Sequence, residues 1–175
     1  MNTKKNDKKR AAAKASEATL SYSADEGPIV QSVMAFIQST TYDEKRLLVA
    51  EHPELLTSKA DEFMARIVEL HRKHGTEQDA DGVQTWREFL SDARRKNFDY
   101  ALANSQINRI FVEMPEDPFE WRAYLKRVAE SEKGLKTKEG DEALAEFATK
   151  IEDGLPDVAA AFQGLRSLVS QLTGK

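Results

Sequence analysis

The sequence contains no cysteine among its 175 residues. Disulfide scaffolds, thiolate zinc sites, iron–sulfur clusters and cysteine nucleophiles are therefore excluded. Long apolar runs are also lacking, because the longest, such as residues 158–162, fall far short of the ~20 residues that cross a bilayer. No apolar stretch follows the first lysines, which argues against a secretory signal. We therefore expect a cytoplasmic protein with no contact to a membrane.

The net charge of −4 hides an uneven distribution along the chain. Six basic side chains and Asp7 give residues 1–14 a charge of +5, which leaves −9 for the remainder. Large apolar side chains are scarce before Gly27, so burial cannot offset the entropy cost of ordering this stretch. We predict that residues 1–27 form a flexible basic arm.

From Pro28 onward, apolar residues recur at the spacing of one helical face, and glycine or proline stands where helices should end. Paired alternating runs joined by a hairpin turn are lacking, so a sheet has little support. The pattern predicts an all-α fold, a compact bundle of about seven or eight antiparallel helices. Residues 28–175 are expected to form a single domain, with 28–103 and 104–175 as possible sub-units.

Capping signals define most of the expected helix ends. Thr41 and Glu44 have the spacing of a capping box, and Asp117 followed by Pro118 is typical of a helix start. The second half continues the helical style without repeating the sequence of the first. The expected helices are residues 28–39, 41–52, one opened by Ser58 and Asp61 and closed by Gly75, a long one over 83–101, a short one over 107–111 for which a single strand stays open, 117–134, one that ends at Gly154, and a last one from Pro156.

An ordered set of residues within the first half resembles a known helical module. It consists of residues 42–48, the turn 51–56 (Glu-His-Pro-Glu-Leu-Leu), 66–70 and 86–90. The set is similar to a module of bacterial multidomain proteins that lies beside tetratricopeptide repeats and CHAT peptidase or nucleotide-binding signalling domains. The resemblance covers about residues 33–102. It implies an all-helical adaptor or assembly module in bacterial signalling, and it implies no chemistry.

Candidate chemical residues do not form a recognisable site. His71 and His74 share a helical face, but nothing completes a metal shell, and we interpret both as favoured by the negative end of their helix. Acidic pairs such as Glu113 with Glu116 have no histidine partner, and no glycine-rich phosphate loop is present. We therefore predict a non-enzymatic protein with no catalytic residue, cofactor or metal. An enzyme alternative would need a cavity, for which Tyr42, His71, Trp86 and Glu113 are candidate lining residues.

Large apolar side chains on the helical stripes supply the candidate contacts to a protein partner. Such side chains are usually core anchors, and interface anchors are the functional alternative. The last helix is apolar around much of its circumference, so it is either the central helix of the bundle or covered by a partner chain. A homo-oligomer also stays open. The candidate partner-binding residues are Trp86, Trp121, Phe162 and Leu165.

Nucleic-acid binding is the alternative function, because clustered basic side chains can neutralise phosphates. A solvated tail and a solvated helix face explain the same composition without any nucleic acid. The candidate phosphate contacts are Lys4, Lys5, Lys8, Lys9 and Arg10 in the arm, and Arg94, Arg95 and Lys96 on a helix.

Overall fold

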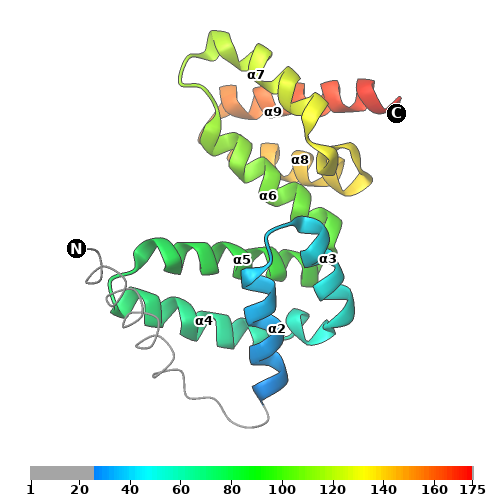
Figure 1. Ribbon diagram of the computed structural model, residues 1–175. Helices are drawn as coiled ribbons and strands as arrows, with labels where there is room; N and C mark the ends of the chain where they lie inside the picture. The colour runs from blue at the N-terminus through cyan, green and yellow to red at the C-terminus, as the bar shows by residue number, and fades with distance from the viewer. Residues whose placement is uncertain (1–25, 175) are drawn as a thin grey trace, which may run out of the picture. The chain divides into compact units, whose positions relative to one another are not determined.

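The computed structural model describes residues 26–174, and every regular element in that range is helical (Figure 1). The predicted all-α class is therefore confirmed for these residues, while the predicted arm, with its five candidate phosphate contacts, lies almost wholly outside them. The elements are α2 (Gly27–Gln38), α3 (Tyr42–Glu51), the 3-10 turn η2 (Pro53–Leu56), α4 (Ser58–Lys73), α5 (Glu77–Arg95), α6 (Phe98–Glu113), α7 (Pro118–Ser131), the 3-10 turn η3 (Lys133–Lys136), α8 (Lys138–Ile151) and α9 (Pro156–Thr173).

Capping side chains start several of these helices where the sequence indicates. Thr41 and Glu44 form a complete capping box at the start of α3. The Asp117 carboxylate accepts a hydrogen bond from the Phe119 N–H at the start of α7. Gly75 takes the left-handed conformation after α4, with φ of 70°. The start of α4 differs from the prediction by one residue, because Thr57 and not Ser58 is the cap.

The predicted long helix over residues 83–101 is wrong. The chain breaks at Asn97, which is extended, and its side chain accepts a hydrogen bond from the Tyr100 N–H at 2.8 Å. Residues 107–111, expected as a short helix or a strand, belong to the 16-residue helix α6. The apolar stripe continues across the break, so helical periodicity alone did not reveal the new cap.

The structure divides into two compact units, of which the first ends at Arg87 and the second begins at Glu88, inside α5. The boundary predicted from the sequence for the two possible sub-units lay elsewhere, between residues 103 and 104. In the first unit, α2 packs on α3, η2 and α4. Its buried apolar side chains include Val33, Phe36, Leu55, Ala60, Phe63, Met64, Ile67, Val68, Ala80 and Val83.

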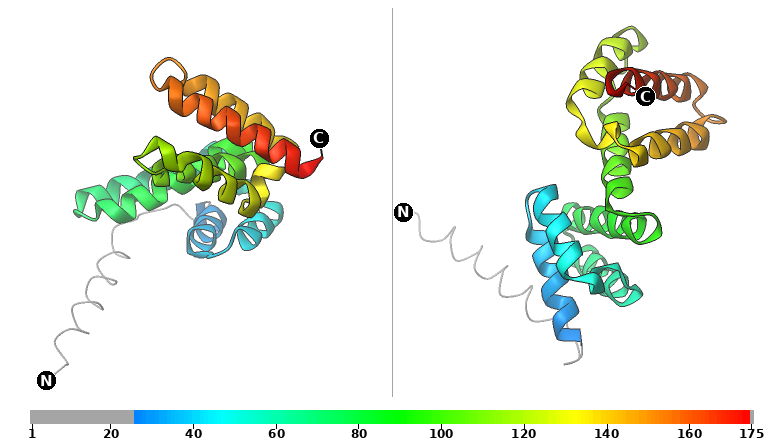
Figure 2. Two further views of the ribbon diagram at one scale, coloured as in Figure 1. Left: turned by 90° about the horizontal axis from the view of Figure 1, so that it is seen from above. Right: turned by 90° about the vertical axis from the view of Figure 1, so that its right-hand side faces the viewer.

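The second unit is built around the pair α8 and α9, which lie antiparallel and side by side (Figure 2). Helix α6 packs on α8, and α7 packs on α9. Within this core the Phe147 and Phe162 ring centres lie 4.7 Å apart, and the ring of the more exposed Phe111 contacts both. The fully buried members of the core include Ile107, Leu135, Leu144, Phe162 and Leu165.

The two units share one internal pattern. Leu55, Thr57 and Asp61 of the first unit recur at the same spacing as Leu135, Thr137 and Asp141 of the second. The hydroxyl of each threonine accepts the N–H three residues later and donates to the carbonyl three residues earlier. The order of α3, η2, α4 and α5 thus recurs as α7, η3, α8 and α9.

A two-point ion pair closes the same pattern in both units. Arg87 donates to both carboxylate oxygens of Asp61, at 2.7 and 2.9 Å. Arg166 donates to both carboxylate oxygens of Asp141, at 2.6 and 2.8 Å. The second half was expected to continue the helical style without repeating the sequence; the style does continue, and a short sequence pattern with its contacts recurs as well.

Candidate functional site

Lys45 of α3 is buried, with only 1% of its surface exposed. Its ammonium donates to the Phe36 carbonyl at 2.6 Å, and to the carbonyl and hydroxyl of Ser39, each at 2.9 Å. These acceptors lie at the carboxyl end of α2, where the helix dipole favours a positive charge. All three ammonium protons therefore have acceptors, and the lysine fastens α3 to the end of α2.

Aromatic rings surround the same ammonium. The Lys45 Nζ atom lies 3.9 Å from the Trp86 ring and 4.6 Å from the centre of the Phe36 ring. Tyr42 contacts Trp86 edge-on, with ring centres 6.2 Å apart. Burial lowers the Lys45 pKa to about 8, although the nearby negative charge of Glu44 acts in the opposite direction and raises it. Because its protons are committed to α2, this lysine fits a structural cation better than a nucleophile.

Ser32, His52 and Glu54 form a second polar cluster in the first unit. The His52 Nδ1 atom lies 3.3 Å from the Ser32 hydroxyl and 3.1 Å from the Glu54 carboxylate. The Ser32 hydroxyl also donates directly to Glu54, which lowers the Glu54 pKa. A catalytic triad needs serine and acid on opposite nitrogens of the histidine, so that the ring can relay a proton. Here one nitrogen faces both groups, and the cluster joins α2 to η2.

The predicted phosphate contacts on α5 and just after it lie among carboxylates in the second unit. The Lys96 ammonium donates to Glu142 and to Glu146, the latter at 3.0 Å. The Tyr100 hydroxyl donates to Glu146 at 2.6 Å, and burial together with that bond raises the Tyr100 pKa to about 12. Arg95 pairs with an aspartate at 3.3 Å, and Arg94 is exposed on the same helix. Lys96 and Arg95 therefore already have acidic partners, and the candidate phosphate contacts of the predicted arm lie outside the described residues.

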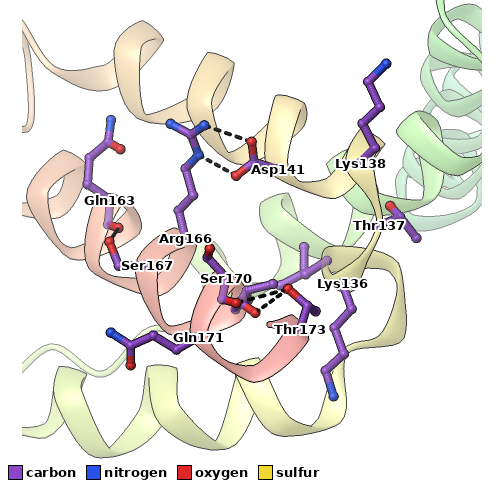
Figure 3. A pocket seen from close by; sticks show the side chains of 12 residues that line it. Lys136, Thr137, Lys138, Asp141, Gln163, Arg166, Ser167, Ser170, Gln171 and Thr173 are labelled. Atoms are coloured by element: carbon purple, nitrogen blue, oxygen red, sulfur yellow. Dashed lines mark hydrogen bonds and ion pairs between the residues drawn. The ribbon is translucent and has the colours of Figure 1, made fainter. Parts of the chain in front are cut away.

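A hollow of about 610 Å³ lies between η3, the start of α8 and α9 (Figure 3). The Arg166–Asp141 pair lines it, and the side chains of Lys136 and Lys138 extend away from that pair. Lys136 donates instead to the Glu130 carbonyl at 2.7 Å. Because the charges of Arg166 and Asp141 neutralise each other, we interpret this pair as a structural contact between α8 and α9 and not as a catalytic centre.

Two large apolar side chains of the second unit are almost fully exposed to solvent. Val112 near the end of α6 is 81% exposed, and Phe119 in the first turn of α7 is 95% exposed. Phe111 beside them is 37% exposed. The sequence reasoning missed Val112 and Phe119, although both lie off the apolar stripes of their helices, and an off-stripe apolar residue was the available signal. The connection between α6 and α7 is visible in Figure 1.

Acidic side chains alternate with these apolar residues. Glu113, Glu116 and Glu120 are exposed, and none of them forms an ion pair with another residue between 26 and 174. Asp117 caps α7. We call this region the α6–α7 surface, and it consists of Phe111, Val112, Glu113, Glu116, Phe119 and Glu120.

The predicted partner contacts lie elsewhere. Phe162 and Leu165 have no exposed surface, so both are core residues, and their assignment as contacts is corrected by their burial. Trp121 is half-buried, and its indole N–H donates to the Pro115 carbonyl at 2.7 Å. Trp86 is also half-buried and stacks on Lys45. On α9, Phe162, Leu165 and Val169 are buried within the second unit, whereas Leu172 is 54% exposed.

Metal-binding and membrane-spanning features are not found in the described part of the chain. No three histidine, aspartate or glutamate side chains of residues 26–174 gather closely enough to hold a metal ion. His71, a candidate cavity residue, lies instead 2.8 Å from the Thr76 hydroxyl. Within the same residues, no helix combines the length and the apolar character needed to cross a bilayer.

No family model, curated protein or solved structure matches this chain.

Proposed function

We propose that this protein is a non-enzymatic helical adaptor that binds another protein through the α6–α7 surface. The observation that carries the proposal is the exposure of Phe119 and Val112, at 95% and 81%. Scattered apolar side chains are normal on any surface, but these two lie off the core stripes, at the end of α6 and the start of α7, and leave apolar area in water that a partner can bury.

The first unit serves as an internal reference for this surface. If the buried pair Val33 and Phe36 of α2 is matched to Ile107 and Ile110 of α6, the position of Val112 corresponds to Gln38. If the two units are matched through their Leu-x-Thr turns, the position of Phe119 corresponds to Ser39. Gln38 is the last residue of α2, whereas Ser39 follows the helix as its cap, so only the Val112 position has a helical counterpart, and that counterpart is polar. The helical pattern therefore tolerates a polar residue at the Val112 position, which supports a role for Val112 in binding.

The polar clusters support the non-enzymatic part of the proposal. Lys45, the Ser32–Glu54 pair and the Tyr100–Glu146 pair each direct their reactive atoms to groups of the chain itself. A catalytic site needs such groups to converge on a space that a substrate can occupy. The bacterial signalling setting of the adaptor rests on the resemblance of residues 33–102 alone.

Affinity capture with cross-linking from native lysate tests the proposed function. The baits are the wild-type chain, the double variant Val112→Ser with Phe119→Ser, and the control Leu47→Ser, which alters a 58% exposed leucine of the first unit. We expect the wild type and the control to recover a common partner that the double variant loses. Equal recovery of every protein by all three baits would reject binding through this surface. Thermal melts should coincide, because exposed substitutions usually change stability by less than ~0.5 kcal/mol.

A further inference from the structure

The charge of the α6–α7 surface indicates the chemistry of its partner. Residues 111–120 read Phe-Val-Glu-Met-Pro-Glu-Asp-Pro-Phe-Glu, with four carboxylates and no basic side chain. Arg122 is the next basic residue along α7, so an excess of negative charge remains around the two exposed apolar residues. We propose that the segment docking there is amphipathic and basic, with apolar side chains flanked by lysine or arginine. This inference rests on the proposed function.

The carboxylates are free to act on a partner. Glu113, Glu116 and Glu120 form no ion pair within residues 26–174, in contrast to Glu142 and Glu146, which share the Lys96 ammonium. Phe119 and Val112 supply the apolar contacts and the glutamates supply a polar rim, which is the common composition of a protein interface. An acidic partner would meet like charges, so its binding is selected against.

Two parts of the interface should contribute differently to binding. The apolar residues should supply most of the affinity, because buried aromatic anchors dominate interface energetics. The rim glutamates should act mainly on the association rate and on the salt dependence, since exposed charges are screened within about 8–10 Å at physiological ionic strength. Removing the apolar pair and removing the charges should therefore give distinguishable losses.

Fluorescence anisotropy with synthetic peptides tests the partner chemistry on the full-length chain. The probe is a dye-labelled amphipathic helical peptide with leucine on one face and lysine on the other, and the charge control carries glutamate in place of lysine. We expect saturable binding of the leucine–lysine peptide, weakened about tenfold or more by Val112→Ser with Phe119→Ser. The leucine–glutamate peptide should show no saturable binding.

A matched pair of charge variants separates local from overall attraction. Glu113→Gln with Glu116→Gln removes two charges from the surface, whereas Glu152→Gln with Asp153→Asn removes two exposed charges from the turn before α9. We expect only the first pair to slow association and to reduce its salt dependence. Equal effects of both pairs would mean that the peptide responds to the overall charge of the chain, and would overturn the inference.

The remaining outcomes also decide the question. Absence of leucine–lysine binding, equal binding of the leucine–glutamate peptide, or unchanged binding to the Val112→Ser and Phe119→Ser variant would each overturn the basic-partner inference. Lysate capture tests the proposed function separately. A partner lost by the Val112→Ser and Phe119→Ser bait, but fully retained by the Glu113→Gln and Glu116→Gln bait at low salt, would keep the docking surface and reject a basic partner.

Discussion

Lys45 and Trp86 form the closest cation–aromatic contact described in the first unit, with Nζ 3.9 Å from the ring. The Leu-x-Thr match between the units aligns Lys45 with Leu125, a core residue of α7. The carbonyl that Lys45 caps belongs to Phe36, and its counterpart on Ile110 accepts from the Tyr124 hydroxyl at 3.2 Å. In both units a side chain thus donates to a carbonyl near the end of a helix. The donor is the Lys45 ammonium in the first unit and the Tyr124 hydroxyl in the second.

Replacing Lys45 by methionine should destabilise the first unit by about 1–3 kcal/mol, because buried acceptors at the end of α2 lose their donor. Trp86 reports on this unit, and a Trp121→Phe background removes the only other tryptophan. Urea unfolding followed by Trp86 fluorescence measures the change. The control Leu125→Met conserves volume in the core of the second unit, so it should cost less than ~1.5 kcal/mol. A Lys45→Met variant as stable as its background would show that the ammonium contributes nothing net.

The same lysine should make the stability of the first unit depend on pH. Its pKa is about 8 in the folded chain and 10.5 in the unfolded one. Between these values the unfolded state holds a proton that the folded state has released, so the free energy of unfolding should rise with pH. Below about pH 8 both states are protonated and this contribution is constant.

Urea titrations of Trp86 fluorescence from pH 7 to about pH 10 test that dependence, with a slope of at most ~1.4 kcal/mol per pH unit for one proton. The Lys45→Met chain is the reference, because it lacks the titrating group and retains the others. Because the wild type gains stability over this range and the variant does not, the difference in unfolding free energy between the two chains should widen as the pH rises. Parallel curves across this range would contradict a lowered lysine pKa.

The helical class and many helix ends were predictable because they depend on local chemistry. The Thr41–Glu44 capping box and the Asp117–Pro118 start need only residues within one turn. The break at Asn97 was not predictable from periodicity, since the apolar stripe resumes directly in α6. Its signal was the asparagine itself, a favoured cap that competes with the helix for backbone hydrogen bonds.

The candidate site was less predictable, because it depends on contacts between distant segments. A lysine in α3 is normally expected in solvent, and it is the approach of the end of α2 and of Trp86 from α5 that buries Lys45. Likewise, the pairing of Arg87 in α5 with Asp61 of α4 joins residues 26 apart, which no local pattern indicates. The recurrence of the units was hidden because the second unit keeps few identical residues and places its arginine one residue closer to its aspartate.

The two-point ion pairs should contribute modestly and unequally to stability. Asp61 and Arg87 are each about one-third exposed, whereas Asp141 and Arg166 are 47% and 40% exposed. Asp61→Asn should therefore lower the free energy of unfolding more than Asp141→Asn does. Both losses should be ~1 kcal/mol, because solvent screens such pairs. Urea unfolding at low and high salt measures both, and the losses should shrink in high salt. A larger loss for Asp141→Asn would contradict the ranking by exposure.

Gly140 and Gly164 lie on neighbouring helices of the second unit and should respond to alanine in opposite directions. A methyl group on Gly140 would lie 2.5 Å from the Gly134 carbonyl and 2.6 Å from the Leu135 carbonyl, and backbone cannot move aside as a flexible side chain does. We expect Gly140→Ala to cost about 1–3 kcal/mol through overpacking. Gly164 has no atom within 4 Å of the added methyl, so Gly164→Ala should stabilise α9 by about 0.5–1 kcal/mol.

Urea unfolding followed by Trp121 fluorescence, in a Trp86→Phe background, measures both alanine variants in the second unit. The first unit shows why the signs should differ. It carries Ala60, fully buried, where the second carries Gly140, so the shared turn accepts a methyl group when η2 leaves room for it. In the second unit η3 approaches α8 more closely than that methyl allows. A Gly140→Ala chain as stable as the Gly164→Ala chain would mean that η3 can move away from α8 at little cost, and the close contact would then not constrain the unit.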